Sequence, residues 1–483
     1  MFRLRSAVNL FLFAGLLIPS YAQTVTARLE GNVQDASGAV IPGAKVSVVD
    51  VKTQQRIEQV LSAQGLFTFP SLQPGTYTLT AEANGFRTEI VSSLELNAAA
   101  VVNQVIKLQV GMSTETISIT ARDEVVQTTD SQRGTSITMR DIDTLPQLGR
   151  SPITLTAFQP GVEFASGDAS FSHVNGQRQG SNNTTLDGID VNDFVAPQLG
   201  LTLTAVNTDS VGEFRMITEG GKAEYGRSAG GQVQLITRSG TNEVHGGLFD
   251  YLRNTDLNAN DLFNNSSGIA RPKFIQNIYG FSLGGPVVLP KIYNGKNKTF
   301  IFGNFQGRRT KQEVVRNRTV LTSDAKKGFF DYKDATGAIQ QYNIVANDTR
   351  KIGIDPAVAK TLALLPDPNN NDLGDALETA GYRFNNSVPS IEDQFTIKGD
   401  QNISSKHHLF LRWSWQRNTA IDSLNNQDAI FPGRVQGTQG GHRWASQPVT
   451  IGTSLPRRSM NSVRATRAQV SFSPAMPVSK AQR

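Results

Sequence analysis

The side chains that could hold a metal ion gather in one short segment of the chain. Asp187, Asp190 and Asp193 recur at three-residue intervals, and Asn192 lies among them. Carboxylate and amide oxygens are the ligands that Ca²⁺ prefers. The segment lacks the spacing and the terminal Glu of a helix-flanked calcium loop, so it also fits a polar, turn-rich loop. We therefore expect neither a metal ion nor another cofactor.

Enzyme chemistry has little support elsewhere in the sequence. The chain has no Cys, which excludes thiolate chemistry and a disulfide framework. None of the five His stands in a His-Glu-x-x-His pattern, and neither a Gly-x-Ser-x-Gly nor a phosphate-loop motif is present. His407 and His408 precede an expected strand and suit a loop better than a ligand pair. We predict that the chain is not an enzyme and has no catalytic residues.

With metal binding and catalysis set aside, the composition of Val174–Asp193 indicates a series of tight turns. Gly, Asn and Asp surround only a few apolar residues, and Asn-Gly and Asp-Gly pairs favour the positive φ angles of tight turns. The segment predicts short strands joined by tight loops.

The N-terminus has the pattern of an export signal. Arg3 and Arg5 precede the apolar run Ala7–Ile18, and Ser20-Tyr21-Ala22 gives a small-x-small ending. We expect a signal peptide over residues 1–22 with Gln23 as the first mature residue; an uncleaved anchor is the alternative. No later segment is apolar enough for a membrane helix, so insertion into a membrane would have to use strands.

The positive net charge comes from the two ends of the chain. No Asp or Glu occurs from Ala429 to Arg483, where eight basic residues lie. Without those eight, Arg3 and Arg5, 37 basic residues remain against 41 acidic ones. Nucleic-acid binding therefore has no electrostatic support.

Residues 23–110 alternate like short strands and are punctuated by Pro-Gly turns, which predicts a small antiparallel β-sandwich. Gly31-x-Val33-x-Asp35, Pro42-Gly43-Ala44 and Gly65-x-Phe67-x-Phe69 resemble the carboxypeptidase regulatory-like domain. That domain carries no peptidase chemistry, and its fold is shared with carbohydrate-binding sandwiches. Its aromatic residues fit core packing or, alternatively, a sugar platform: Phe67, Phe69, Tyr77 and Phe86.

Residues 124–241 resemble the plug domain of TonB-dependent outer-membrane receptors. The resemblance lies in Asn175-Gly-Gln-Arg178, Ser181-Asn-Asn183 and Leu186-Asp-Gly188, with Leu145-Pro-x-x-Gly149-Arg150 before them and Ala223-Glu-Tyr-Gly226 after them. It implies an α+β plug whose loop gates a ligand path. The gate residues implied are Asn175, Gln177, Arg178, Asn182, Asn183, Asp187 and Asp190.

The linker 111–123 contains an extended, alternating segment that suits strand addition by a partner. It resembles a TonB box, the peptide gripped by the inner-membrane energiser, although a last sandwich strand is the alternative. The candidate box comprises Glu115, Thr116, Ile117, Ser118, Ile119, Thr120 and Ala121.

Residues 242–428 carry the alternating, aromatic-rich strands of an outer-membrane β-barrel. Five candidate strands lie at 245–254, 276–286, 298–308, 395–403 and 408–415, with polar loops expected at Asn254–Phe274 and Thr310–Asn385. The family has about 22 strands and a barrel must close, so most of the barrel is expected to be missing. The tail 429–483 loses strand alternation and resembles out-of-frame translation or a truncated product; a genuine basic tail is the alternative.

Together these features predict a mainly β protein of the outer membrane: an Ig-like or carbohydrate-binding-like sandwich, an α+β plug and an incomplete antiparallel barrel. Arg271-Pro-Lys-Phe274, Gly284-Gly-Pro286 and Asn297-Lys-Thr-Phe300 resemble the Oar-like branch of the receptors. The resemblance implies energised uptake of a carbohydrate or an oligopeptide, inactive in this fragment. The partners implied are a TonB-type energiser, outer-membrane lipid and an external ligand, with no nucleic acid. The alternatives are a sugar-binding sandwich and a structural or adhesion protein without transport.

Overall fold

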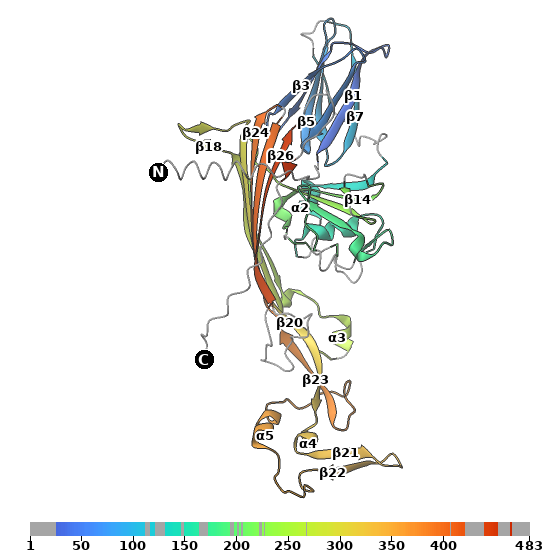
Figure 1. The fold of residues 1–483 in the computed structure, drawn as a ribbon, viewed down its shortest axis with the longest axis vertical. Coiled ribbons are helices and arrows are strands. Elements are labelled where there is room, and N and C mark those ends of the chain that lie inside the picture. Colours follow the sequence, from blue (N-terminus) through green and yellow to red (C-terminus); the bar gives the residue numbers. More distant parts are fainter. Residues whose placement is uncertain are drawn as a thin grey trace.

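The computed structural model describes residues 26–111, 116–120, 131–145, 149–163, 172–193, 198–199, 202–203, 206–221, 225–226, 228–266, 268–405, 407–420, 439–452 and 464–465. The expected signal peptide, Glu115, Ala121 and much of the tail lie outside the described residues. In Figure 1 the sandwich lies at the top, the plug lies below it, and a long sheet runs beside both. A search of the described helices found none with the length and apolarity needed to cross a membrane.

The first unit is a β-sandwich of two facing sheets, as expected. One sheet has the order β4-β1-β7 and the other the order β3-β2-β5-β6-β8. The expectation of a purely antiparallel sandwich is wrong, since β1 pairs with β7 and β6 with β8 in parallel. The reason is that the chain crosses between the sheets after β6 instead of returning beside it. The strands are β1 (Ala27–Asp35), β2 (Lys45–Asp50), β3 (Arg56–Val60), β4 (Leu66–Leu72), β5 (Gly75–Glu82), β6 (Thr88–Leu96), β7 (Val101–Leu108) and β8 (Thr116–Thr120).

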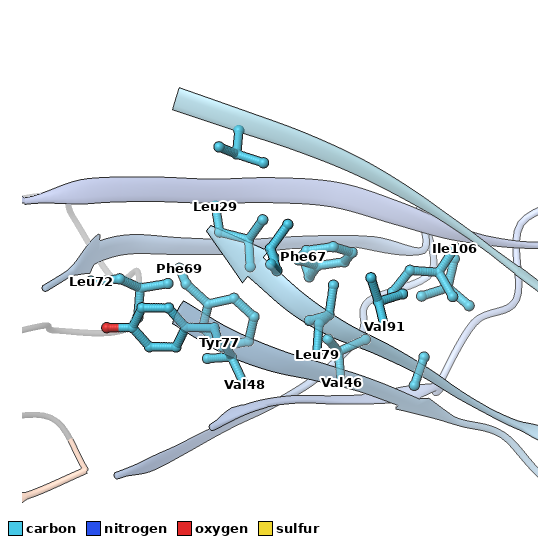
Figure 2. Close-up of a cluster of buried hydrophobic side chains, with 14 of the residues drawn as sticks. Leu29, Val46, Val48, Phe67, Phe69, Leu72, Tyr77, Leu79, Val91 and Ile106 are labelled. Atoms are coloured by element: carbon cyan, nitrogen blue, oxygen red, sulfur yellow. The ribbon is translucent and has the colours of Figure 1, made fainter. Parts of the chain in front are cut away.

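The aromatic residues of the sandwich form its core rather than a sugar platform. Phe67, Phe69 and Tyr77 are at most 4% exposed, and Phe86 packs against the same cluster. Figure 2 shows the labelled side chains filling the space between the two sheets. A Cβ at Gly31 would lie 1.8 Å from the carbonyl oxygen of Gln104, so only glycine allows this packing.

Tyr77 offers a test of this core assignment. Its buried hydroxyl donates a hydrogen bond of 2.7 Å to the carbonyl oxygen of Gln73. Tyr77→Phe leaves that bond unmade, and we expect it to lower the free energy of unfolding of the sandwich by about 1 kcal/mol. Denaturant-dependent hydrogen exchange of β5 amides would measure the loss. Tyr342→Phe, at a half-exposed tyrosine outside the sandwich, is the matched control and should leave β5 unchanged.

The second unit is the predicted α+β plug. Its mixed sheet has the order β13-β12-β15-β14-β9 and buries one apolar cluster that includes Phe214, Met216 and Leu235. Both predicted tight turns are present, with positive φ at Asn175-Gly176 and at Asp187-Gly188. The elements are β9 (Arg133–Thr138), α2 (Met139–Thr144), η2 (Pro152–Phe158), β10 (Val162–Glu163), β11 (His173–Val174), η5 (Gln179–Ser181), β12 (Asn183–Leu186), β13 (Ile189–Asp190), η6 (Thr208–Ser210), β14 (Val211–Glu219) and β15 (Gln232–Thr237).

The third unit is a long antiparallel sheet with the order β16-β17-β20-β24-β25-β26-β27. All five predicted strand ranges lie in it, and within the described residues its end strands β16 and β27 do not pair with each other. The expected loss of strand structure after Ala429 is wrong for β26, which pairs with β25 along its whole length. The strands are β16 (His245–Asn254), β17 (Phe274–Pro286), β20 (Thr299–Leu321), β24 (Ser390–Ser404), β25 (His407–Ala420), β26 (Gln439–Gly452) and β27 (Arg464–Ala465).

The two expected loops differ in how much regular structure they contain. Thr310–Asn385 is not simply a loop, because β20 continues through it to Leu321 and pairs there with β23. Asn254–Phe274 connects two strands as expected. The connecting elements are η8 (Thr255–Leu257), α3 (Leu262–Ser266), β18 (Val288–Leu289), β19 (Tyr293–Asn294), α4 (Ser323–Lys326), β21 (Phe329–Lys333), β22 (Ile339–Asn343), α5 (Pro356–Leu362) and β23 (Thr379–Ser387).

Candidate functional site

The long sheet has its polar and apolar faces reversed relative to a water-soluble sheet. Along β24 and β25, alternate residues on one face are polar yet buried, among them Lys398, Arg412 and Ser414. The opposite face exposes large apolar side chains: Tyr279, Phe281, Leu283, Ile301, Ile391, Ile403, Leu411 and Trp413. An apolar outer face and a polar inner face are the arrangement of a membrane barrel, whose outside meets lipid.

The polar inner face contacts the plug through charged side chains at Asp187. This side chain is 3% exposed and lies in the tight turn between β12 and β13. Its two oxygens accept hydrogen bonds from the amide and hydroxyl of Thr237, at 2.9 and 2.8 Å. The Nε atom of Arg412 lies 2.9 Å from one oxygen, and Nζ of Lys398 lies 3.8 Å from the other. We call Asp187, Thr237, Lys398 and Arg412 the Asp187 lock.

The charges of the Asp187 lock depend on one another. The side chains of Lys398 and Arg412 are at most 5% exposed, so water contributes little to their solvation. Lys398 also donates to the carbonyl oxygen of Thr237 at 3.2 Å and lies 4.8 Å from the ring centroid of Phe410. Removing one partner would leave the other charge buried and uncompensated, which is strongly destabilising, so each side of the Asp187 lock requires the other.

Three further contacts join the plug to the sheet along the strands. Asn207, which caps η6, donates to the side-chain oxygen of Asn304 at 2.7 Å. Arg308 of β20 donates to the carbonyl oxygen of Gly149. The neighbouring Arg150 pairs with Asp209 at 2.8 Å and lies 4.2 Å from the ring centroid of Tyr251 on β16. The plug is therefore held at several points along the inner face.

The other predicted gate residues hold the plug's own turns. Asn175 donates to the carbonyl oxygen of Thr218, and the side-chain oxygen of Asn182 accepts from the amide of Gly231. Asn183 is buried and donates to the carbonyl oxygen of Tyr225. Gln177 and Arg178 are exposed. Asn175 and Gln177 also line a polar cavity of about 490 Å³, together with Ile217, Thr218, Glu219, Gln232 and nearby small residues.

The aspartates of the calcium hypothesis do not converge. Asp187 faces two cations, whereas Asp190 accepts hydrogen bonds from the backbone and side chain of Asn192 at 2.9 and 2.6 Å. Within the described ranges, no group of three or more His, Cys, Asp or Glu side chains could hold a metal ion.

The described part of the candidate TonB box, Thr116–Thr120, forms β8 at the edge of the sandwich. It pairs in parallel with β6, from Thr88 opposite Thr116 to Ser92 opposite Thr120. The structure thus has the alternative arrangement, a last sandwich strand. As the final strand in its sheet, β8 has no strand on its outer edge among the described residues. Such an edge can accept another strand.

The barrel side of the Asp187 lock was missed by reasoning from the sequence. Lys398 follows Phe395-Thr-Ile397, Arg412 lies between Leu411 and Trp413, and both occupy inward positions of the alternating pattern. The available signal was a basic residue on the inward face of each predicted barrel strand, although polar residues are common on that face of a barrel.

Comparison with known proteins agrees with this geometry. Residues 28–109 match the carboxypeptidase regulatory-like domain, as predicted. Residues 236–478 match the family described as outer membrane beta barrel domain, which covers half of the chain and most of the range 429–483. The chain belongs to the outer membrane beta barrel family. The predicted outer-membrane localisation is therefore confirmed.

The relatives of this barrel-family chain include TonB-dependent proteins, which confirms the predicted resemblance. It is 27% identical over 322 residues to the TonB-dependent transporter Oar of Myxococcus xanthus, a match covering 64% of this chain and 29% of that protein. The chain thus spans under a third of the length of this curated relative.

Solved structures give fainter likenesses. The transporter YddB from Escherichia coli matches at 12% identity and a TM-score of 0.36, over 67% of this chain and 46% of that one. The ferric enterobactin receptor PfeA from Pseudomonas aeruginosa matches at 15% identity and a TM-score of 0.34, over 68% and 48%.

Proposed function

We propose that this chain is the sandwich, the plug and the first barrel strands of a TonB-dependent receptor that takes up an external ligand. The observation that carries the proposal is the Asp187 lock. It joins a plug turn to the buried polar face of a sheet whose other face suits lipid. A plug held by a few polar contacts, rather than by an apolar core, is suited to move within its barrel.

The proposed movement starts at β8. An energiser strand added to the free edge of β8 would pull on the chain between β8 and β9. β9 is the edge strand of the plug sheet and pairs with β14, which pairs with β15. Thr237, the last residue of β15, belongs to the Asp187 lock. A pull on β8 would therefore reach the lock through two strand pairs.

The ligand class remains a carbohydrate or an oligopeptide in this proposal. The cavity beside Asn175 and Gln177 supports either class, because side-chain amides can donate hydrogen bonds to, and accept them from, the uncharged polar groups of sugars and peptides. The sugar-binding sandwich has no comparable support, since its aromatic residues are buried in the core.

Membrane insertion is the first test. Leu411 lies on the exposed apolar face of β25, so Leu411→Lys places a charge where lipid is expected and should cost about 2–4 kcal/mol. Fractionation of outer membranes should then show much less inserted protein. Leu66→Lys, at a comparably exposed leucine of the sandwich, is the matched control and should insert normally. Equal insertion of both variants would contradict the lipid assignment.

Binding to the energiser distinguishes a TonB-dependent receptor from an adhesion protein and from a glycan-binding sandwich. The purified chain in detergent should bind the periplasmic domain of a TonB-type protein in a calorimetric titration. An adhesion protein would insert into the membrane without this binding, and a glycan-binding sandwich would bind sugars without it. Absence of energiser binding would therefore overturn the proposed function.

A further inference from the structure

A strand of the plug is buried on both of its faces, and the sandwich covers one of them. Phe214 and Met216 of β14 point into the plug core and are fully buried. The intervening residues Glu213, Arg215 and Ile217 are at most 8% exposed, although two of them are charged. A strand alternates its side chains between two faces, so these three share the face opposite the core.

The sandwich residues that cover this face lie in the loop between β6 and β7. The amide of Ala98 donates to a carboxylate oxygen of Glu213 at 2.7 Å, and the guanidinium of Arg215 donates to the carbonyl oxygen of Ala98. The two backbone groups of one residue are thus bound by two ionisable side chains. Next to them, Ala99 packs with Ile217 and Tyr225 in a small buried cluster.

The contact depends on the shape of the loop as well as on these hydrogen bonds. Ala99 has a φ of 52°, a left-handed conformation that is unfavourable for alanine. The guanidinium of Arg215 also donates a hydrogen bond of 3.4 Å to the side-chain oxygen of Gln132. Because the plug binds the backbone of Ala98, substituting that side chain would not by itself remove these bonds.

We propose that Asn97–Ala100 is a releasable latch by which the sandwich holds β14 of the plug, and that the protonation of Glu213 sets how tightly it holds. The latch acts on β14, whereas the Asp187 lock acts through its neighbour β15. The sandwich and the barrel sheet therefore restrain adjacent strands of the same plug sheet. This inference goes beyond the proposed function and can hold or fail independently of it.

The surroundings of Glu213 determine the direction of the pH dependence. Burial raises its pKa from 4.5 to about 7, against the opposing effects of the Ala98 amide, Arg215 and the Ser136 hydroxyl, while Glu95 raises it further. An undocked, solvated Glu213 should have an ordinary pKa near 4.5. The docked state therefore binds a proton more tightly. Docking is strongest below the undocked pKa and weakens as the pH rises to about 7, by roughly two orders of magnitude in the docking constant.

Hydrogen exchange of the full chain in detergent tests the latch. After correction for intrinsic exchange, protection of residues 97–100 should fall by about two orders of magnitude between pH 5 and pH 8. In Glu213→Gln the side chain stays neutral, and protection should not change over this range. Glu219→Gln, an exposed carboxylate at the end of the same strand, is the matched control and should follow the wild type. Protection of β1 and β12 reports whether each variant is folded.

A cysteine pair provides a second measurement in this Cys-free chain. Ala99→Cys with Ile217→Cys places two thiols in the same buried cluster. Diamide, which takes up the two electrons and two protons of the thiols, should link them near neutral pH, and the linked chain should keep residues 97–100 protected at pH 8. A latch that opens equally at both pH values in the wild type, or a Glu213→Gln variant with unchanged pH dependence, would overturn the proposal. So would failure of the thiols to link in a folded chain.

Discussion

Asp187→Asn is expected to lower the free energy of unfolding of the plug and barrel sheet by about 3–5 kcal/mol. Asparagine keeps the hydrogen-bonding shape of the side chain and tolerates the positive φ at this position, so the change removes little except the charge. It leaves Lys398 and Arg412 buried without their shared anion. Denaturant unfolding in detergent would measure the loss. Trp413, which follows Arg412 on β25, and Trp415 supply a fluorescence signal.

Two further variants make this result specific to the lock. Asp190→Asn changes an exposed carboxylate of the same loop and should cost less than about 1 kcal/mol. Asp187→Asn combined with Arg412→Gln removes both partners and should cost less than the sum of the single changes, as expected for coupled residues. Additive losses, or equal losses at positions 187 and 190, would show that the lock contributes no coupling.

Proline in β8 is expected to abolish binding of the energiser, since proline cannot donate to a strand ladder and fixes φ. Successive amides of a strand point to opposite edges, so Ile117→Pro and Ser118→Pro act on different edges of β8. One variant removes an outward donor, and the other disturbs the pairing with β6. We expect the first to lose energiser binding while the sandwich keeps its stability. The second should loosen β8 from β6.

The two proline variants control for each other. Titration of the energiser's periplasmic domain measures binding, and hydrogen exchange of β6 measures the pairing. If both variants bind the energiser as tightly as the wild type, Thr116–Thr120 is not the TonB box. If neither binds and the sandwich has unfolded in both, substituting Thr116 or Thr120 with proline tests the ends of the strand.

The features that follow from nearby residues were predictable. Asn175-Gly176 and Asp187-Gly188 form the expected turns because their backbone preference is local. The alternation of the five barrel strands was also readable, since one face of each strand is apolar. β26 was missed because Gly440, Gly441 and Pro448 weaken its strand pattern, and it is formed by pairing with β25.

The contacts that join the units were not predictable from one sequence. Asp187 was selected as a plug residue, but nothing near it indicates that Lys398 and Arg412 would meet it. These partners lie far along the chain and depend on the register of β24 against β25. The hydrogen bonds of Glu213 and Arg215 to Ala98 could not be predicted either, because the sandwich contributes only backbone atoms to them and no side chain marks the position.

The length of β20, 23 residues, determines how far the segment after it lies from the membrane. At about 3.3 Å per residue the strand is roughly 75 Å long, whereas a tilted barrel strand crosses the membrane with about 9–11 residues. The remaining half, paired with β23, lifts α4, α5 and the β21–β22 hairpin well clear of the lipid (Figure 1). Antibodies or proteases added to intact cells should therefore reach residues 322–378 without any damage to the envelope. This segment is the place to insert an epitope for counting the protein on living cells.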